Sequence, residues 1–214
     1  MIKYILFDLD GTLTNPKEGI TRCVQHALRH FGIERECDEL VCFIGPPLKE
    51  QFMEYASLTE EEGVKAVEVY RERFAPIGLF ENKIYDGVLE MLTQLKSQGK
   101  IIAVATSKPA VFAERICEKY GITPYLSHLS GSELDGRNTD KALVIKNAME
   151  SLGADASETV MVGDRIHDCE GAAKNGIGCI GVSYGYAAEG ELERGGVIDI
   201  AHSPKELLEI LSQL

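Results

Sequence analysis

Short apolar segments that end in polar residues recur along the chain. The first covers residues 3–8, and three more follow late in the sequence, at residues 100–106, 159–164 and 179–183. Continuous apolar runs of this length, bounded by glycine or acidic residues, are typical of strands that are buried on both faces of a parallel sheet. The pattern therefore predicts several buried parallel strands.

Helical patterns lie between these strands. Apolar residues repeat with helical spacing over residues 88–98, and further helices are expected over 110–120 and 141–152. Each of the three segments is followed by a glycine, at Gly99, Gly121 and Gly153, which is the residue that most often ends a helix. Strands that alternate with helices of this length indicate βαβ units. We therefore expect an α/β fold with a doubly wound parallel sheet.

Residues 15–85 break this alternation. Helical periodicity covers residues 19–31, a Gly-Pro-Pro sequence interrupts it at 45–47, and a new helix is expected to start at Leu48. A long acidic helix over residues 59–74 follows, and Thr59 with Glu62 fits a capping box. The chain is thus predicted to consist of an α/β core, residues 1–14 and 86–214, with an all-helical domain at residues 15–85 inserted in it.

The charge of the chain restricts its partners. The 214 residues include 22 basic and 34 acidic side chains, which gives a net charge of −12. Binding to nucleic acid polymers or to anionic membranes depends on basic side chains that neutralise phosphates, so neither partner is expected. An acidic protein that binds a small anion would also need local positive charge at its site.

The remaining composition fits a globular protein of the cytoplasm. Apolar residues make up 44% and charged residues 26% of the chain. No apolar stretch is long enough for a membrane span, and the apolar N-terminal run is too short for a signal peptide. The cysteines form no CxxC pair, which favours reduced thiols over disulfides or a zinc site; they are Cys23, Cys37, Cys42, Cys117, Cys169 and Cys179.

Reactive polar residues follow the predicted strands. Ligands of open α/β sheets bind outside the carboxyl ends of the strands. The first strand ends in Asp8-Leu9-Asp10, the second in Thr106-Ser107-Lys108, and the third in Asp164 with Asp168 four residues on, while Lys141 opens a helix between the last two. Each piece alone is also a common turn or helix start, but their joint occurrence in this order favours a shared site.

A cluster of carboxylates at one edge of a sheet requires a cation. Four aspartates, at positions 8, 10, 164 and 168, cannot all stay ionised side by side without one. Hard oxygen ligands favour Mg²⁺, which with Lys141 supplies the positive charge that the composition requires. Thr106, Ser107 and the backbone amides of Leu9 and Asp10 can donate hydrogen bonds to a phosphoryl group, whose transfer depends on positioning and charge neutralisation.

Four of these segments together resemble the motifs of the haloacid dehalogenase-like hydrolases. They are FDLDGT at residues 7–12, the strand that ends at Thr106, Lys141, and GDRIHD at 163–168. The resemblance covers essentially the whole chain. It implies that Asp8 is the nucleophile that forms an aspartyl-phosphate, and that Asp10 is the acid/base and also reaches the metal through its backbone carbonyl.

The resemblance assigns the other residues as well. Thr106 and Lys141 bind the phosphoryl group, and Asp164 and Asp168 hold Mg²⁺ together with Asp8. Asp10 favours phosphatases, because members of the family that cleave carbon–halogen bonds lack an aspartate at that position. The helical insertion lies where the family has its cap domain, and a capped site favours small substrates over phosphoproteins.

Details of the sequence point to one branch of the family. Residues 132–141 and 181–186 resemble the phosphoglycolate phosphatases and 5'-nucleotidases, whereas Tyr85-Asp86-Gly87 stands where many relatives have Tyr-Pro-Gly. Lys49 at the start of a cap helix either contacts a substrate anion or is solvated. Lys108 either adds positive charge at the phosphate or simply begins the next helix.

The predicted function is the Mg²⁺-dependent hydrolysis of a small phosphate monoester, phosphoglycolate or a nucleoside monophosphate. A sugar-phosphate mutase of the same family is an alternative, which would have to favour return of the phosphoryl group to sugar over transfer to water. A phosphate-sensing protein that resembles a response-regulator receiver is a further alternative, although receivers are shorter and lack the insertion. The sequence leaves the substrate open, and also whether the protein is a monomer or a homodimer.

Overall fold

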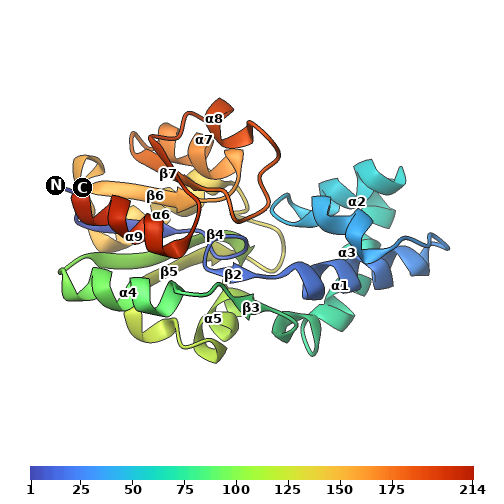
Figure 1. The fold of residues 1–214 in the computed structure, drawn as a ribbon. Helices are drawn as coiled ribbons and strands as arrows, with labels where there is room; N and C mark the ends of the chain where they lie inside the picture. Colours follow the sequence, from blue (N-terminus) through green and yellow to red (C-terminus); the bar gives the residue numbers. More distant parts are fainter. The chain divides into compact units, whose positions relative to one another are not determined.

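The computed structural model describes all of residues 1–214, which divide into two compact units (Figure 1). One comprises Met1–Asn15 and Ile84–Leu214 and is called the α/β unit here. The other comprises Pro16–Lys83 and is called the helical unit. The chain therefore leaves the α/β unit once, after its first strand and turn, and returns to it for the remainder of the fold.

The α/β unit is built on a six-stranded sheet with the order β5-β4-β1-β6-β7-β8. All its neighbouring strands are parallel, so the predicted fold class is confirmed. The strands are β1 (Tyr4–Phe7), β4 (Ile101–Pro109), β5 (Leu126–Ser132), β6 (Thr159–Gly163), β7 (Gly178–Val182) and β8 (Asp199–Ala201).

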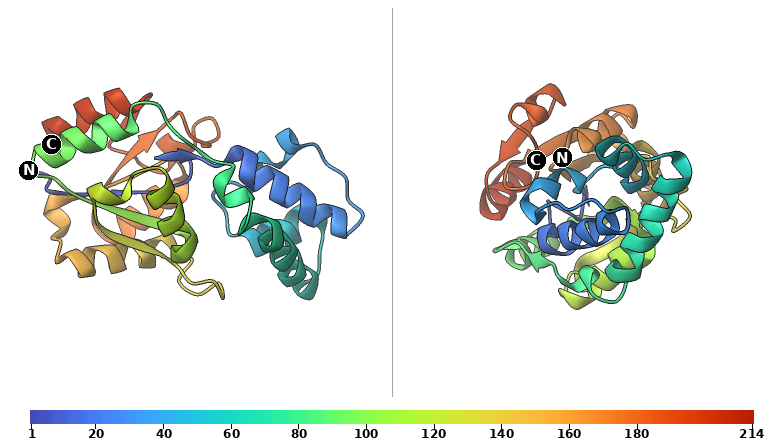
Figure 2. Two further views of the ribbon diagram at one scale, coloured as in Figure 1. Left: turned by 90° about the horizontal axis from the view of Figure 1, so that it is seen from below. Right: turned by 90° about the vertical axis from the view of Figure 1, so that its right-hand side faces the viewer.

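Helices cover both faces of this sheet. α4 (Val88–Ser97), α5 (Ala110–Lys119) and α9 (Pro204–Gln213) lie on one face, where α4 and α9 run side by side (left view of Figure 2). α6 (Lys141–Leu152) and α7 (Ile166–Lys174) pack together on the other face, over a core that includes Leu6 and Met161. The short elements are η3 (Thr123–Tyr125), η4 (Ala156–Glu158) and α8 (Glu191–Arg194).

The central strand determines where the polar strand ends meet. Phe7 at the end of β1 is level with Val104 of β4 on one side and with Val162 of β6 on the other. The helices that follow β4 and β6 pass to opposite faces, and α/β sheets generally bind their ligands at the carboxyl ends of such strands. Asp8, Thr106 and Asp164 all follow these registered positions within two residues.

The sequence pattern missed two strands of the sheet. β5 and β8 are its two edge strands, and an edge strand tolerates polar residues because one side of its backbone faces no other strand. β5 has the sequence LSHLSGS and β8 has only three residues, so neither has a long apolar run. The predicted segments at 3–8, 100–106, 159–164 and 179–183 all coincide with strands, with ends displaced by at most three residues.

The helical unit contains three helices and two 3₁₀ turns: α1 (Lys17–His30), η1 (Cys37–Phe43), α2 (Leu48–Ala56), α3 (Glu60–Phe74) and η2 (Gly78–Phe80). Four buried aromatic residues form a chain of ring contacts, from Phe43 to Phe52, from Phe52 to Tyr70 and from Tyr70 to Phe74. The predicted capping box of α3 is confirmed, since Glu62 N–H donates to Thr59 Oγ1 at 3.3 Å and Thr59 N–H donates to Glu62 Oε2 at 2.8 Å.

Two very short strands stand at the boundary with the helical unit. β2 (Thr14–Asn15) and β3 (Lys83–Ile84) pair with each other, and all their residues except Thr14 lie in the segment 15–85 that the sequence predicted to be helical. With two residues each, they are too short to show the alternation of apolar and polar residues by which a strand is recognised in a sequence. No helix in either unit combines the length and the apolar character needed to cross a membrane.

Candidate active site

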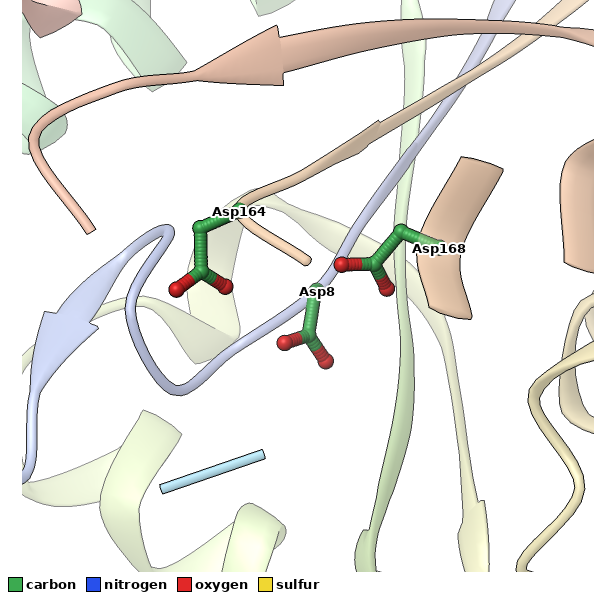
Figure 3. Close-up of side chains that lie close together, drawn as sticks. All are labelled: Asp8, Asp164 and Asp168. Atoms are coloured by element: carbon green, nitrogen blue, oxygen red, sulfur yellow. The ribbon is translucent and has the colours of Figure 1, made fainter. Parts of the chain in front are cut away.

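Three buried aspartates converge at the carboxyl edge of the sheet (Figure 3). Asp8 directly follows β1, Asp164 directly follows β6, and Asp168 lies in the first turn of α7. One oxygen of each carboxylate lies within 4.8 Å of the others. Since β1 and β6 are neighbours, the first two residues meet because of strand register, and α7 turns the third back towards them.

Lys141 joins this cluster from the start of α6. Its Nζ donates to Asp8 Oδ1 at 2.7 Å and to the carbonyl of Ala105 at 3.0 Å, and it lies 2.9 Å from Asp168 Oδ1. Asp140 fixes the helix start, because its side chain accepts the N–H of Leu143. Burial alone would lower the pKa of Lys141, but Asp168 and Asp8 outweigh it and raise that pKa. The lysine is thus held as a cation.

The charges of this cluster do not balance. Three ionised carboxylates and one ammonium leave an excess of two negative charges. Burial raises the pKa of Asp164 well above its usual range, and the negative charges of Asp168 and Asp8 raise it further. Burial likewise raises the pKa of Asp168, against the opposing effect of Lys141. A divalent cation among these oxygens would remove the repulsion, so the donor set fits such an ion.

Two glycines bring the backbone close to the side chains of Asp164 and Asp168. A Cβ atom at Gly163 would lie 2.2 Å from Cγ of Asp168, and one at Gly185 would lie 2.4 Å from Cβ of Asp164. Neither position tolerates a side chain. Asp168 Oδ2 accepts the N–H of Arg165 at 3.0 Å, and Asp164 Oδ2 accepts the N–H of Tyr186 at 2.8 Å. Both carboxylates are therefore oriented by backbone donors.

Asp10 does not belong to this trio, and its side chain pairs with Lys108. The Lys108 ammonium donates to Asp10 Oδ2, and both side chains are largely buried. The second oxygen, Oδ1, is buried and has no hydrogen-bond partner. Burial raises the pKa of Asp10, although Lys108 opposes the rise. Lys108 lies at the end of β4 and α5 begins only at Ala110, so this lysine does not start the helix and instead contacts the site.

The predicted phosphate-binding residues line the same edge. Thr106 is buried near the end of β4, and its Oγ1 accepts the N–H of Lys108 at 3.3 Å. The carbonyl of Ser107 accepts the hydroxyl of Ser132 at 2.8 Å. The carbonyl of Leu9 accepts the N–H groups of Leu13 and Thr14, which closes the turn after Asp8. The roles assigned to these residues remain predictions.

Sequence left the role of one residue open and missed the contact of another. Lys49 belongs to the helical unit, where its Nζ lies 3.2 Å from Oε1 of Glu60 at the surface, so its role stays open. Glu191 contacts Arg165 and Ile166, which lie between Asp164 and Asp168, but this contact was not predicted. Nothing in the sequence separates Glu191 from the neighbouring Glu189 and Glu193.

Comparison with a protein-family model gives a match over most of the chain. The model described as haloacid dehalogenase-like hydrolase matches residues 5–182. A 5'-nucleotidase from Pseudomonas aeruginosa is 46% identical over 211 residues, which cover 98% of this chain and 92% of that protein. The family predicted from the four motifs is thereby confirmed.

Further relatives carry other names. The tyrosine-protein kinase PtkA of Mycobacterium tuberculosis is 34% identical over 93% of this chain and 68% of its own. A phosphoglycolate phosphatase from Vibrio parahaemolyticus is 28% identical over 99% of this chain and 96% of its own. The crystal structure of a predicted phosphatase from Clostridium acetobutylicum matches with a TM-score of 0.97 and 43% identity, and covers both chains completely.

Proposed function

The chain belongs to the haloacid dehalogenase-like hydrolases, and from this we propose that it hydrolyses small phosphate monoesters with Mg²⁺ through a covalent phosphate on Asp8. The observation that carries the proposal is the convergence of Asp8, Asp164 and Asp168, two of which, Asp8 and Asp168, pair with Lys141. These groups come from three separate parts of the sequence. Burying their excess negative charge would destabilise the fold unless a cation compensated it.

Asp8, Asp164 and Asp168 would hold the Mg²⁺ ion, with the backbone carbonyl of Asp10 as a further ligand. When bound, Mg²⁺ supplies neutralisation of the phosphoryl oxygens and fixes their orientation. Lys141 extends the positive charge to the same region, because its ammonium contacts Asp8 directly. Thr106, Ser107 and the N–H groups of Leu9 and Asp10 would donate hydrogen bonds to the remaining phosphoryl oxygens.

The protein's own residues account for both halves of the reaction. A carboxylate oxygen of Asp8 attacks phosphorus and the bond to the leaving oxygen breaks, while Asp10 gives that oxygen a proton. Asp10 then takes a proton from water, whose oxygen attacks the phosphorus and releases Asp8 and inorganic phosphate. A carboxyl group with a raised pKa and an oxygen lacking a partner suits this work as acid and base.

Lys108 supports this role of Asp10. Its ammonium holds one carboxylate oxygen, and this leaves the other oxygen for proton transfer. Of the two roles that the sequence left open for Lys108, we propose the one at the site. The helical domain predicted at residues 15–85 would act as the cap that excludes water and restricts the enzyme to small substrates.

For the substrate we propose a nucleoside 5'-monophosphate. A 5'-nucleotidase shares 46% of its residues with this chain over nearly the full length of both. Phosphoglycolate is the second candidate, because phosphatases for that compound also match across the chain, at 28–29% identity. Measured values of kcat/KM for a panel of 5'-nucleotides, phosphoglycolate and sugar phosphates would decide between them, and a higher value for phosphoglycolate would reverse the order.

The mechanism is tested by Asp8→Asn. Phosphate release from p-nitrophenyl phosphate in Mg²⁺ should fall by about 10³-fold or more, since the nucleophile is lost, and chelation of Mg²⁺ should abolish the activity of the wild type. Asp199→Asn is the matched control, because Asp199 is exposed in the edge strand β8. Unchanged activity of Asp8→Asn would contradict the mechanism. Isomerised sugar phosphate as the main product would favour a mutase.

A further inference from the structure

Another buried carboxylate contacts the segment that carries two of the site's aspartates. Glu191 begins the short helix α8, and only 6% of its surface is exposed. It belongs to none of the motifs that carry the predicted chemistry. It is not one of the three aspartates whose oxygens lie together.

Glu191 binds the segment that carries two of those aspartates. Its Oε1 accepts from Arg165 Nε at 2.8 Å and from the backbone N–H of Ile166 at 2.9 Å. Its Oε2 accepts the N–H of Ala188 at 2.9 Å. Arg165 and Ile166 stand between Asp164 and Asp168, so one carboxylate holds both residues that follow Asp164.

The same segment orients Asp168 directly. The backbone N–H of Arg165 donates to Asp168 Oδ2 at 3.0 Å, and Gly163 leaves the room that this carboxylate needs. A continuous set of hydrogen bonds thus leads from Glu191 through Arg165 to Asp168. Any shift of the Arg165 backbone would displace the donor that fixes the Asp168 carboxylate.

From these contacts we propose that Glu191 is a positioning residue for the cation, which holds Arg165 and Ile166 so that Asp164 and Asp168 face the same point. The inference rests on the proposed function, because it assumes a divalent cation at the three aspartates. Partners that orient the ligands of a metal commonly contribute about 10- to 100-fold in metal affinity or activity. Glu191 would be such a partner.

The electrostatic cost of Glu191 supports a specific role. A buried carboxylate near three others is unfavourable unless it is paired and hydrogen-bonded. Arg165 supplies the opposite charge and two backbone N–H groups supply the rest, so that the pKa of Glu191 is lowered in spite of its burial. Two of its three donors belong to the segment between the aspartates, and only one belongs to the loop before α8.

The test is direct Mg²⁺ binding to Glu191→Gln by titration calorimetry, together with the Mg²⁺ concentration that gives half-maximal hydrolysis of p-nitrophenyl phosphate. Glutamine has nearly the same shape as glutamate, but its amide NH₂ replaces one carboxylate oxygen. That NH₂ group cannot accept the hydrogen bond which the oxygen accepted from an N–H group. Mg²⁺ affinity should fall about tenfold or more, while kcat at saturating Mg²⁺ recovers. Glu193→Gln makes the same change at an exposed residue of the same helix and should bind Mg²⁺ as the wild type does.

A second variant keeps the test valid if Glu191→Gln does not fold. Arg165→Gln removes the positive charge that pairs with Glu191. Because the Arg165 side chain is partly exposed, this variant should disturb folding less, and it should also weaken Mg²⁺ binding. A merely structural role would reduce the folded fraction at every Mg²⁺ concentration without shifting the midpoint. Wild-type Mg²⁺ affinity in the folded variants overturns the inference alone, whereas a wild type that binds no Mg²⁺ overturns the proposed function and with it this inference.

Discussion

The two units of the chain place their charges in opposite ways. In the α/β unit, Asp8, Asp164, Asp168 and Glu191 are all buried and are bound by lysine, arginine or backbone donors. In the helical unit, the fully buried residues are apolar or aromatic apart from Thr21, and every charged side chain stays at least partly exposed.

The difference separates a unit organised for chemistry from one organised for packing. Removing charge from water is expensive unless it is compensated, so a fold retains buried charges only where strand register and helix starts hold their partners in place. The helical unit has no such cluster, and its stability comes from apolar contact. Substitutions should therefore affect activity in the first unit and only stability in the interior of the second.

Lys141→Met should give the largest effect. It leaves Asp8 and Asp168 without their cation, which should abolish phosphate release and lower the free energy of unfolding by about 3–5 kcal/mol in the absence of Mg²⁺. Lys146→Met is the control, because Lys146 lies on the same helix, is exposed and is 3.7 Å from Glu150. Denaturant unfolding and kinetics would detect the contrast, and equal behaviour of the two variants would refute it.

Phe52→Ala tests the packing of the helical unit. Phe52 is fully buried and its ring lies 4.9 Å from that of Phe43, so the cavity should cost about 3–5 kcal/mol. Val64→Ala on α3 removes an apolar side chain that is 48% exposed and should have little effect. Denaturation followed by circular dichroism measures both, and a small loss for Phe52→Ala would show that the aromatic cluster is not the core of this unit.

Lys108→Met probes the second buried pair of the α/β unit. Asp10 would lose the ammonium that orients its carboxylate, and kcat should fall about 10- to 100-fold with little change in KM. Lys174→Met, at an exposed lysine of α7, should leave the kinetics unchanged. If Lys108→Met keeps the wild-type kcat, the lysine has no part in proton transfer.

Glu81→Gln tests a partly exposed ion cluster of the helical unit. Arg73, and then Arg22, lower the pKa of Glu81, with Arg73 at 2.7 and 2.9 Å. A lowered pKa in the folded state stabilises the fold above the unfolded pKa, and this stability is lost as pH falls through the folded value. The free energy of unfolding of the wild type, measured by denaturant titration, should exceed that of Glu81→Gln by roughly 1–2 kcal/mol at neutral pH. A difference that persists in strong acid would contradict the assignment.

Thr59→Ala should give the smallest effect. The substitution removes the hydroxyl that accepts the N–H of Glu62 at the start of α3, which should cost about 1 kcal/mol. Thr59→Ser keeps the hydroxyl and is the matched control. The free energies of unfolding of the wild type, Thr59→Ala and Thr59→Ser would test this. Equal losses of stability in the two variants would show that the hydroxyl contributes nothing.

The sequence predicted those parts of the protein that depend on local patterns. β1 and β6 are uninterrupted apolar runs, α6 begins and ends at the predicted residues 141 and 152, and Thr59 caps α3 as expected. The edge strands β5 and β8 escaped prediction, because an edge position needs no apolar run. The family also followed from sequence, since its motifs stand at strand ends in a fixed order.

Which partner each charge has was decided only by the tertiary structure. Lys108 pairs with Asp10 because β4 lies beside β1, and Glu191 binds Arg165 because the chain returns past α7 before β8. Neither contact leaves a pattern in the sequence, where Lys108 could equally start a helix and Glu191 resembles its exposed neighbours. Local sequence determines the elements and their reactive ends, whereas strand order and register determine which of those ends meet.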